Sequence, residues 1–353
     1  MKILILGGTG AMGEPLVQLL SNSDNVVFVT SRAYHENDRN INYIQGNAKD
    51  IYFLEKILNE KFDIIIDFMI YSTLEFKERV EKLLNSSKQY IFISSSRCYA
   101  NSEQEIEENT KRLLDAISDE NYLATDDYAL AKAREENILR QSKLQNWTII
   151  RPYITYNSQR LQLGCYEKEY WLYRILHNKT IVLPEDILNR VTTITYGDDV
   201  ANCIIQLIGS ERALGECFTI VTREPHTWKE ILEYYRDAVF LKTGKKLKSI
   251  TIPNSKEMYG VCDKYQIQYD RVYNRKFNIN KLDNTIGKYN FFNTKDGIKK
   301  CIDEFIENPK WGCISAKYEA WSDRYTHEFS SLSEFKGIKE KLRYIKWRFI
   351  KKP

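Results

Sequence analysis

Tyr128 and Lys132 are the pair of side chains in this sequence best suited to proton transfer. They stand four positions apart in Tyr128-Ala-Leu-Ala-Lys132, so on a helix both side chains lie on one face. A lysine ammonium beside a phenol stabilises the phenolate and brings the tyrosine toward the pKa range useful for proton exchange. In a chain with 24 tyrosines this spacing also arises by chance. The alternative interpretation is therefore that the two residues are an ordinary exposed pair on a helix. The neighbouring motifs decide between these two interpretations.

A run of hydroxyl side chains follows a strong strand pattern upstream of this pair. The apolar run from Tyr90 leads into Ser94-Ser95-Ser96, and an open α/β sheet places its ligand groups at the carboxyl ends of its strands. A serine hydroxyl at that position would hold a substrate oxygen beside Tyr128. The alternative is that these serines only cap the strand.

The first strand pattern runs directly into a glycine-rich turn. The turn has the spacing GxxGxxG over Gly7-Gly8-Thr9-Gly10-Ala11-Met12-Gly13, and a helical pattern follows it. Glycines permit the sharp turn and the close approach to a pyrophosphate, whose charge is favoured at a helix N-terminus. A glycine cluster alone would be an ordinary tight turn, but a position between strand and helix is what dinucleotide binding requires. We therefore predict a dinucleotide site that includes Gly7, Thr9, Gly10, Ala11, Met12 and Gly13.

The end of the second strand bears on which dinucleotide is bound. It reads Val29-Thr30-Ser31-Arg32 and has no Asp or Glu to take the ribose hydroxyls of NAD. Arg32 suits a 2′-phosphate, so Ser31 and Arg32 predict NADP, with NAD as the alternative. Arg32 would otherwise be a solvated surface residue. After the third strand, Asn47 and Ala48 are expected at the adenine, where Asn47 would hydrogen-bond the edge of the base.

Alternating strand and helix patterns position these residues. Strands are predicted at Lys2–Leu6, Val26–Thr30, Asn42–Ile44, Asp63–Phe68, Tyr90–Ser94 and Trp147–Arg151, and helices at Met12–Leu20, Ile51–Asn59, Leu74–Asn85, Glu105–Ile117 and Asp127–Leu139. This alternation predicts an α/β fold, a doubly wound parallel sheet of the Rossmann type. The dinucleotide-binding domain is expected over residues 1–156. Parts of 190–225 return to it, through a helix at Asp198–Ile208 and a strand at Cys217–Val221.

The rest of the chain, 157–353, is expected to form mainly a smaller α+β substrate lobe with a C-terminal helical extension. Thr227–Lys242 reads as one of its helices. The basic stretch Lys336–Pro353 carries interleaved Tyr344, Trp347, Phe349 and Ile350. We expect a terminal helix that packs its apolar side on the domain, with contact to a membrane surface or RNA as the alternative.

Length and composition exclude several classes of protein. The 353 residues are 43% apolar and 28% charged, which is typical of a globular protein with a real core. The net charge of +4 is too small to indicate a nucleic-acid partner. Seven scattered cysteines form no CxxC pair and the four histidines show no metal spacing, so no metal site is predicted. No apolar stretch approaches the roughly 18–20 residues of a membrane span, and a cytoplasmic location is expected.

Taken in order, the motifs resemble those of a known superfamily. The glycine turn, the serine-rich strand end with Tyr99, Tyr128-x-x-x-Lys132 and Arg151-Pro152 resemble the extended short-chain dehydrogenases/reductases. More narrowly they are similar to the NAD-dependent epimerase/dehydratase family, whose members mostly process nucleotide-linked sugars. Two later segments, Thr192–Ala201 and Phe277–Leu282, resemble further family segments.

The resemblance implies roles for individual residues. Tyr128 would be the general acid/base, with Lys132 as its partner. Ser95 stands at the family's catalytic Ser/Thr position relative to Tyr99, with Ser96 as the second choice. Phe68 and Pro152 would join the cofactor-binding residues, with Pro152 near the nicotinamide. A homodimer is common in the family.

The sequence also departs from the family pattern. Ser96-Arg97 stand where sugar-nucleotide 4,6-dehydratases carry Asp-Glu, which disfavours a dehydratase. The fourth strand ends in Asp67-Phe68-Met69, and a short connection follows it, as in atypical members that include plastid RNA-binding relatives.

The function that we expect is NADPH-driven reduction of a nucleotide-linked keto sugar, in which Tyr128 delivers a proton to the oxygen. A nucleotide-sugar 4-epimerase is the alternative. A non-catalytic RNA-binding or regulatory relative is the second alternative, against which the intact Ser95, Tyr128 and Lys132 argue. Arginine side chains suit the diphosphate of a nucleotide-linked substrate, and four arginines are candidates for binding it: Arg97, Arg160, Arg271 and Arg275. The alternative is that these arginines form salt bridges at the surface.

Overall fold

The strands predicted in the first 150 residues all belong to one parallel sheet. The computed structural model describes residues 1–350 and contains a seven-stranded sheet in the order β11-β6-β5-β4-β1-β2-β3, in which every pairing is parallel. Its strands are β1 (Lys2–Leu6), β2 (Val26–Ser31), β3 (Ile41–Gln45), β4 (Phe62–Asp67), β5 (Ser87–Ile93), β6 (Trp147–Pro152) and β11 (Glu216–Ile220). The doubly wound α/β fold predicted from the sequence is confirmed.

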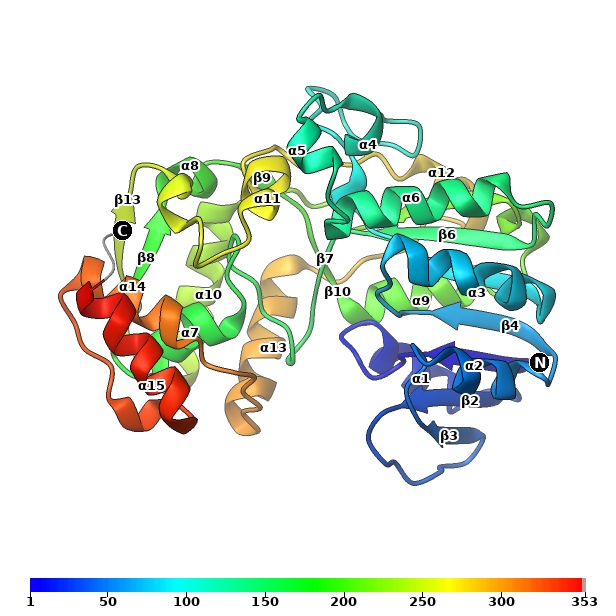
Figure 1. Ribbon diagram of the computed structural model, residues 1–353, viewed down its shortest axis with the longest axis horizontal. Coiled ribbons are helices and arrows are strands. Elements are labelled where there is room, and N and C mark those ends of the chain that lie inside the picture. Colours follow the sequence, from blue (N-terminus) through cyan, green and yellow to red (C-terminus); the bar gives the residue numbers. More distant parts are fainter. Residues whose placement is uncertain (351–353) are drawn as a thin grey trace. The chain divides into compact units, whose positions relative to one another are not determined.

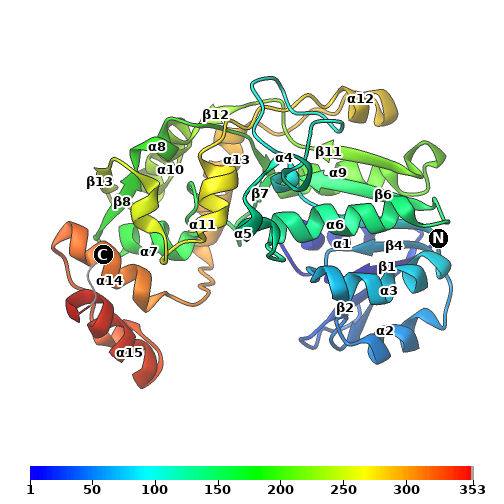
Figure 2. The ribbon, with the colours of Figure 1, turned by 45° about the horizontal axis from the view of Figure 1, so that its top comes forward.

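Helices cover both faces of this sheet. The helices of the first 155 residues and of the segments that return to the sheet are α1 (Gly13–Leu20), α2 (Ile51–Leu58), α3 (Thr73–Asn85), α4 (Leu113–Ala116), α5 (Glu120–Leu123), α6 (Tyr128–Gln141), α9 (Gly197–Leu207) and α12 (Asn280–Ile286). Helices α2, α3 and α6 lie on one face, and α1 and α9 pack together on the other (Figure 1 and Figure 2). Strands covered in this way are buried on both sides, and the β1 residues Ile3–Leu6 are fully buried.

The chain divides into two compact units that are discontinuous in sequence. The first consists of Met1–Thr155, Thr193–Arg223 and Phe277–Phe292, and the second of Tyr156–Thr192, Glu224–Lys276 and Asn293–Pro353. The strand predicted at Cys217–Val221 is β11, which returns to the sheet of the first unit, where it pairs with β6. The chain first leaves the first unit at the short strand β7 (Ile154–Tyr156), and it returns just before the short strand β10 (Ile194–Tyr196).

The prediction of a helix over Glu105–Ile117 is largely wrong. Only α4 is helical there, and the residues before it form an extended connection. Long-range contacts order this connection, because Ile106 bridges to Phe277 and Asn278 donates its backbone N–H to the Ile106 carbonyl at 2.9 Å. Such partners lie far away in the sequence, so the local pattern does not contain them.

The second unit is built mainly from helices. They are α7 (Lys168–Leu176), α8 (Glu185–Leu188), α10 (Trp228–Thr243), α11 (Lys264–Gln266), α13 (Thr294–Glu307), α14 (Ala316–Thr326) and α15 (Gly337–Ile345). Two small ladders accompany them, β8 (Thr180–Pro184) with β13 (Lys248–Ile252) and β9 (Val191–Thr192) with β12 (His226–Thr227). The helix predicted over Thr227–Lys242 is confirmed as α10, which begins at a capping box formed by Thr227 and Glu230.

The basic stretch predicted to be a terminal helix contains α15 and a π-helical turn, Lys346–Ile350. The end of that stretch, 351–353, lies outside the described residues. Within residues 1–350, none of the helices combines the length and the apolar character that crossing a bilayer demands.

Candidate active site

The glycine turn between β1 and α1 has the geometry that a pyrophosphate requires. Gly7 has φ +72°, a left-handed conformation that side chains other than glycine rarely adopt. A Cβ atom on Gly13 would lie 2.7 Å from backbone atoms of Gly8, so this glycine allows α1 to approach the turn closely. A Cβ atom on Gly10 would meet nothing within 4 Å. The turn is therefore tight at both ends and open in the middle, where Thr9 and Gly10 are exposed.

The end of β2 presents one buried hydroxyl and one exposed cation. Ser31 is buried, and its Oγ accepts the Ala33 N–H at 3.2 Å and lies 3.1 Å from His35 Nε2. The Arg32 side chain is exposed, as is that of Asn47 after β3, while Ala48 is buried. The position of Arg32 suits a solvent-facing phosphate.

Helix α6 carries Tyr128 at its first position and Lys132 one turn later. Its N-cap is Asp127, whose carboxylate accepts the Ala129 N–H at 3.2 Å and the Tyr122 hydroxyl at 3.1 Å. Tyr128 is half-buried, and the Arg97 guanidinium lies 5.2 Å from the centre of its ring.

Glu136 anchors this helix to the sheet. Its carboxylate accepts Arg151 Nε at 2.8 Å and Arg151 Nη2 at 2.5 Å, together with the Ser94 hydroxyl at 2.6 Å. Arg112 Nη1 adds a contact at 3.3 Å. All of Glu136 is buried, so burial alone would raise its pKa, but Arg151 and these hydrogen bonds lower it overall. The helix is thus attached to the carboxyl ends of both β5 and β6.

Lys132 is buried and is held between a carboxylate and a backbone carbonyl. Its Nζ lies 3.0 Å from Glu135 Oε2 and donates to the Met69 carbonyl at 3.4 Å. The ammonium also lies 4.4 Å from the ring centre of Phe92 on β5. Only 1% of Lys132 is exposed, so these groups, and not water, surround and stabilise its ammonium group.

Two further carboxylates are buried in this region, Glu135 and Asp67. Burial raises the pKa of Glu135 to about 7, an effect that Lys132 opposes and Asp67 reinforces. Burial also raises the pKa of Asp67, whose carboxylate accepts Tyr90 Oη at 2.8 Å and the Met69 N–H at 2.9 Å. Sequence reasoning missed Glu135, although its place three residues after Lys132 is the spacing of a helical ion pair.

Met69, which follows β4, joins the glycine turn to this lysine. Its Sδ would lie 2.8 Å from a Cβ on Gly7, and its carbonyl accepts from Lys132. The glycine turn and the Tyr128–Lys132 helix therefore converge at the carboxyl end of β4. No local signal marked Met69 for this position.

The predicted serines occupy the end of β5 in different ways. Ser95 is buried, and its Oγ accepts the Arg97 N–H at 3.2 Å, at the start of a short 3₁₀ turn, Ser96–Cys98. The Ser96 hydroxyl donates to the Arg151 carbonyl at 2.9 Å. Ser96 is thus engaged with the β6 backbone, while Ser95 caps the turn that carries Arg97.

Phe68 and Pro152 lie on neighbouring parts of the same sheet. Phe68 follows β4 and donates its N–H to the Leu6 carbonyl at 2.9 Å, at the end of the strand that enters the glycine turn. Pro152 is buried at the end of β6.

The two arginines expected to meet a substrate diphosphate are buried in the second unit around one carboxylate. Arg275 Nε donates to Asp270 at 3.0 Å, and Arg271 pairs with the same carboxylate and donates to the Gly164 carbonyl at 2.8 Å. Their exposures are 1% for Arg271 and 0% for Arg275. In this arrangement both side chains cross-link their own unit.

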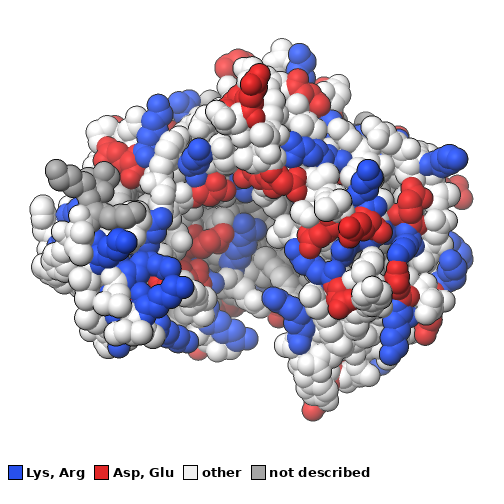
Figure 3. All heavy atoms as spheres, viewed as in Figure 1, with Lys and Arg blue, Asp and Glu red and all other residues white. Residues whose placement is uncertain are grey.

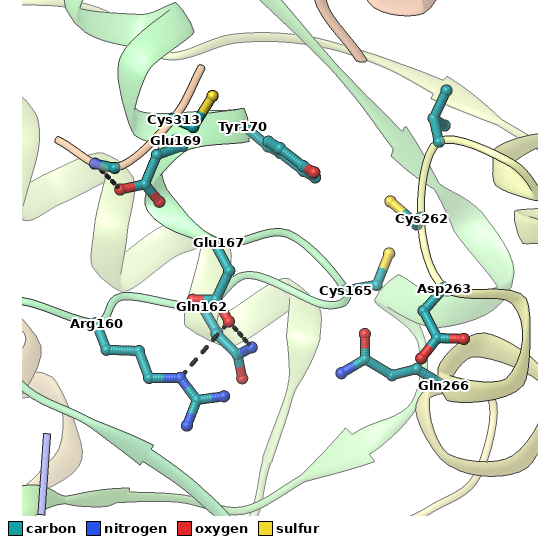
Figure 4. A pocket seen from close by; sticks show the side chains of 12 residues that line it. Arg160, Gln162, Cys165, Glu167, Glu169, Tyr170, Cys262, Asp263, Gln266 and Cys313 are labelled. Carbon is teal, nitrogen blue, oxygen red and sulfur yellow. Dashed lines mark hydrogen bonds and ion pairs between the residues drawn. The ribbon is translucent and has the colours of Figure 1, made fainter. Parts of the chain in front are cut away.

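Arg160 lines a cavity of about 510 Å³ within the second unit. Its Nε lies 3.5 Å from Glu167 Oε1, and the cavity is also lined by Glu169 and Asp263 (Figure 4). Cys165 and Cys262 direct their sulfur atoms into it (Figure 4). With three carboxylates and one guanidinium, this lining suits hydroxyl groups better than a diphosphate.

Within the described residues 1–350, no group of three or more His, Cys, Asp and Glu side chains is arranged to hold a metal ion.

Residues 7–169 match a protein family described as NAD(P)H-binding. This span begins at the glycine turn and includes Tyr128, Lys132 and Pro152. The residues of the turn fit the phosphates of such a cofactor, because a Cβ on Gly10 would enter open space while Gly13 brings the start of α1 close.

Two curated proteins share sequence with the chain. One is the chloroplast stem-loop binding protein of 41 kDa b of Arabidopsis thaliana, 27% identical over an alignment of 236 residues that covers 62% of this chain and 58% of that protein. The chain thus spans less than two thirds of this relative. The other is a UDP-glucose 4-epimerase of Lactobacillus helveticus, 35% identical over 89 residues, which are 24% of this chain and 26% of that enzyme.

The fold has close counterparts among solved structures. The UDP-glucuronic acid 4-epimerase of Bacillus cereus, in complex with UDP-glucuronic acid and NAD, matches with a TM-score of 0.65 at 14% identity. That match covers 87% of this chain and 99% of the epimerase. The resemblance drawn from the motifs is confirmed at the level of the fold: residues 7–169 match the NAD(P)H-binding family, and the chain has the fold of this epimerase.

Proposed function

We propose that the chain is an NAD(P)-dependent oxidoreductase that acts on a nucleotide-linked sugar, most simply by reducing a keto sugar. The observation that carries this proposal is the position of Met69, whose Sδ would lie 2.8 Å from a Cβ on Gly7 and whose carbonyl accepts a hydrogen bond from Lys132. A dinucleotide held at the glycine turn would therefore extend toward the helix that carries Tyr128.

The protein's own residues would bind the cofactor and move one proton. Gly7, Gly10 and Gly13 would hold its phosphates. When bound, the nicotinamide supplies or accepts hydride. Tyr128 would give its hydroxyl proton to the substrate oxygen during reduction, with Ser95 as hydrogen-bond donor to the same oxygen. Lys132 would stabilise the resulting phenolate by its charge.

The cofactor that we propose is NADPH. Arg32 is exposed at the end of β2, and the strand end Val29–Arg32 contains no carboxylate. A guanidinium there would bind a 2′-phosphate with charge-assisted hydrogen bonds.

Epimerisation at C4 of the sugar is the second candidate. The similarity to a UDP-glucose 4-epimerase and to a UDP-glucuronic acid 4-epimerase supports it. The same Tyr128 and Ser95 would serve, since an epimerase removes hydride and returns it to the other face. RNA binding without catalysis is a third candidate, supported by the similarity to a stem-loop binding protein.

The cofactor state of the purified protein tests these candidates. Released nucleotide would be identified by mass spectrometry, and the emptied protein titrated with NADPH and NADH. Exchangeable binding with a preference for NADPH would support the reductase, and keto sugars would then be screened. Retained NAD would support the epimerase and contradict our assignment of NADPH. Binding of neither nucleotide would contradict the enzyme proposal and favour the third candidate.

A further inference from the structure

Helix α15 and the π-helical turn that follows it present apolar side chains to solvent. Ile338 is 71% exposed, Leu342 58%, Ile345 36% and Phe349 63%. Their spacing of three or four residues places them on one face, and we call these four residues the apolar stripe. Phe329 extends it, because its ring is 66% exposed and lies 6.4 Å from that of Phe349. A continuous exposed apolar surface of this kind indicates an interaction site.

The opposite face of α15 is fastened to its own unit. Tyr344 is 3% exposed, stacks on Phe335 at 5.0 Å, and donates its hydroxyl to Asp323 Oδ2 at 2.7 Å. Its oxygen also accepts the Ser330 N–H at 3.0 Å. Turning the apolar stripe inward would break these buried contacts. The stripe therefore faces solvent because of how the helix is anchored.

Basic side chains border the apolar stripe. Residues 337–350 contain five Lys and Arg against the single acid Glu340, which already pairs with Arg343 at 2.5 Å. At the α-helical period, Lys339 and Lys346 fall on one side of the stripe and Lys341 on the other. Figure 3 shows Lys and Arg side chains gathered where α15 lies. Arg348 lies over the rings of Phe329 and Phe349, at 4.7 and 5.4 Å.

We propose that α15 and the turn after it dock on the surface of an anionic phospholipid bilayer. The apolar stripe would enter the interface between headgroups and acyl chains, and the bordering cations would meet lipid phosphates. Lysines on both sides of the aliphatic side chains complement such a bilayer surface, since long lysine side chains can reach the headgroups while the stripe is buried.

The composition of the surface disfavours the two other occupants. The stripe is mainly aliphatic: Ile338, Leu342 and Ile345 cannot stack on bases. Only at its end do Phe329 and Phe349 combine rings with a cation, as surfaces that bind single-stranded nucleic acid do along their length. A symmetric dimer through α15 would bring the cations of one copy against those of the other. A lipid surface satisfies both the charge and the apolar area.

Co-sedimentation of the full chain with vesicles tests the proposal. The probes are vesicles of phosphatidylcholine alone and of phosphatidylcholine mixed with phosphatidylglycerol. We expect binding to the mixed vesicles, weaker binding at high salt, and little binding to phosphatidylcholine. The double variant Ile338→Gln/Leu342→Gln should lower the partition coefficient by about tenfold or more. Lys339→Glu/Lys346→Glu should lower it by about tenfold or more as well.

Matched controls lie on or next to other helices of the same unit. Leu241 is 72% exposed on α10, so Leu241→Gln removes an exposed apolar side chain outside the stripe. Lys229→Glu/Lys310→Glu makes the same charge change at exposed positions on α10 and just after α13. Both controls should bind vesicles as the wild type does. The exposed positions should leave the thermal unfolding midpoint unchanged in every variant.

Three kinds of result would overturn the proposal. The first is failure in the vesicle assay, either because the wild-type chain sediments with neither kind of vesicle or because the Ile338→Gln/Leu342→Gln variant binds as strongly as the wild type. The second is light scattering that shows a dimer which this variant dissociates, without vesicle binding. The third is polyuridine binding that Lys339→Glu/Lys346→Glu abolishes, again without vesicle binding.

Discussion

Glu135 and Glu136 are adjacent on α6 but meet opposite electrostatic surroundings. Glu135 Oε2 lies 3.0 Å from Lys132 Nζ, whereas Glu136 binds both Nε and Nη2 of Arg151 and the Ser94 hydroxyl. Burial raises the pKa of Glu135 to about 7, while at Glu136 the arginine outweighs burial and the pKa is lowered. Glu136 is therefore charged at neutral pH and fastens the helix, while its neighbour Glu135 exchanges a proton near neutral pH.

The first prediction concerns Glu135→Gln. A carboxyl whose pKa rises on folding holds its proton more tightly in the folded state, so its contribution to stability falls as pH rises from 4.5 to about 7. The free energy of unfolding of the wild type minus that of Glu135→Gln should fall by up to about 3 kcal/mol across this window. Urea unfolding at several pH values measures it. The exposed Glu103→Gln should show no such trend, and a flat difference for Glu135→Gln would contradict the prediction.

Glu136→Gln should have the opposite pH dependence. The variant leaves the buried Arg151 without its carboxylate, while Arg112 keeps its pair with Asp115, and breaking a buried ion pair costs about 3–5 kcal/mol. Because folding lowers the pKa of Glu136, its stabilisation is present at neutral pH and is lost as pH falls through the folded-state pKa. The free energy of unfolding of Glu136→Gln should therefore lie far below that of the wild type at pH 7. In acid the two values should differ little. Equal differences at both pH values would show that the charge is not what stabilises the helix.

Tyr128→Phe should remove the proton donor and leave the cofactor site intact. We expect turnover to fall by about 10²–10⁴-fold, with the NADPH dissociation constant unchanged. Turnover of an identified keto sugar and NADPH fluorescence titration are the two measurements. Tyr52, which is 79% exposed, provides the control Tyr52→Phe. Full activity of Tyr128→Phe would remove Tyr128 from the chemistry.

Arg32→Ala should discriminate between the two dinucleotides. Loss of a charge-assisted contact to the 2′-phosphate should weaken NADPH binding by about 10- to 100-fold and leave NADH binding unchanged. Parallel titrations of the variant and of Arg212→Ala, an exposed arginine elsewhere in the unit, measure the effect. An equal effect on both nucleotides, or none on either, would mean that Arg32 does not read the phosphate.

Gly10→Ala and Gly13→Ala should separate cofactor binding from stability. A Cβ on Gly13 would lie 2.7 Å from the Gly8 backbone, so this variant should lose about 1–3 kcal/mol of stability. A Cβ on Gly10 meets nothing within 4 Å, so Gly10→Ala should unfold like the wild type but bind NADPH more weakly. Unchanged NADPH binding by Gly10→Ala would place the phosphates elsewhere.

The sheet could be predicted from the sequence because its strands are continuous apolar runs. Strand β1 matched its prediction from Lys2 to Leu6, and the return of β11 was also predicted. The connection before α4 could not be predicted, because it is ordered by the pairing of Ile106 with Phe277, which lies far away in the sequence. The short segment Phe277–Phe292, which the sequence division gave to the second lobe, belongs to the first unit for the same reason.

The site was only partly visible in the sequence. The glycine turn and the Tyr128–Lys132 pair are marked by local spacing, and so could be named without coordinates. Arg271 and Arg275 looked like substrate contacts because the sequence does not show that Asp270 is buried between them. Glu135 and Met69 were missed because their importance comes from burial beside Lys132, which depends on how α6 packs.

The discontinuity of the first unit has a consequence for how the protein is made. On the ribosome, β6 emerges well before its partner β11, and α12 emerges later still, at Asn280–Ile286. Until then the nascent sheet has β6 as an open edge that can pair with other chains. Completion of the cofactor-binding unit must therefore wait for translation past residue 292, and a fragment ending near residue 155 should aggregate.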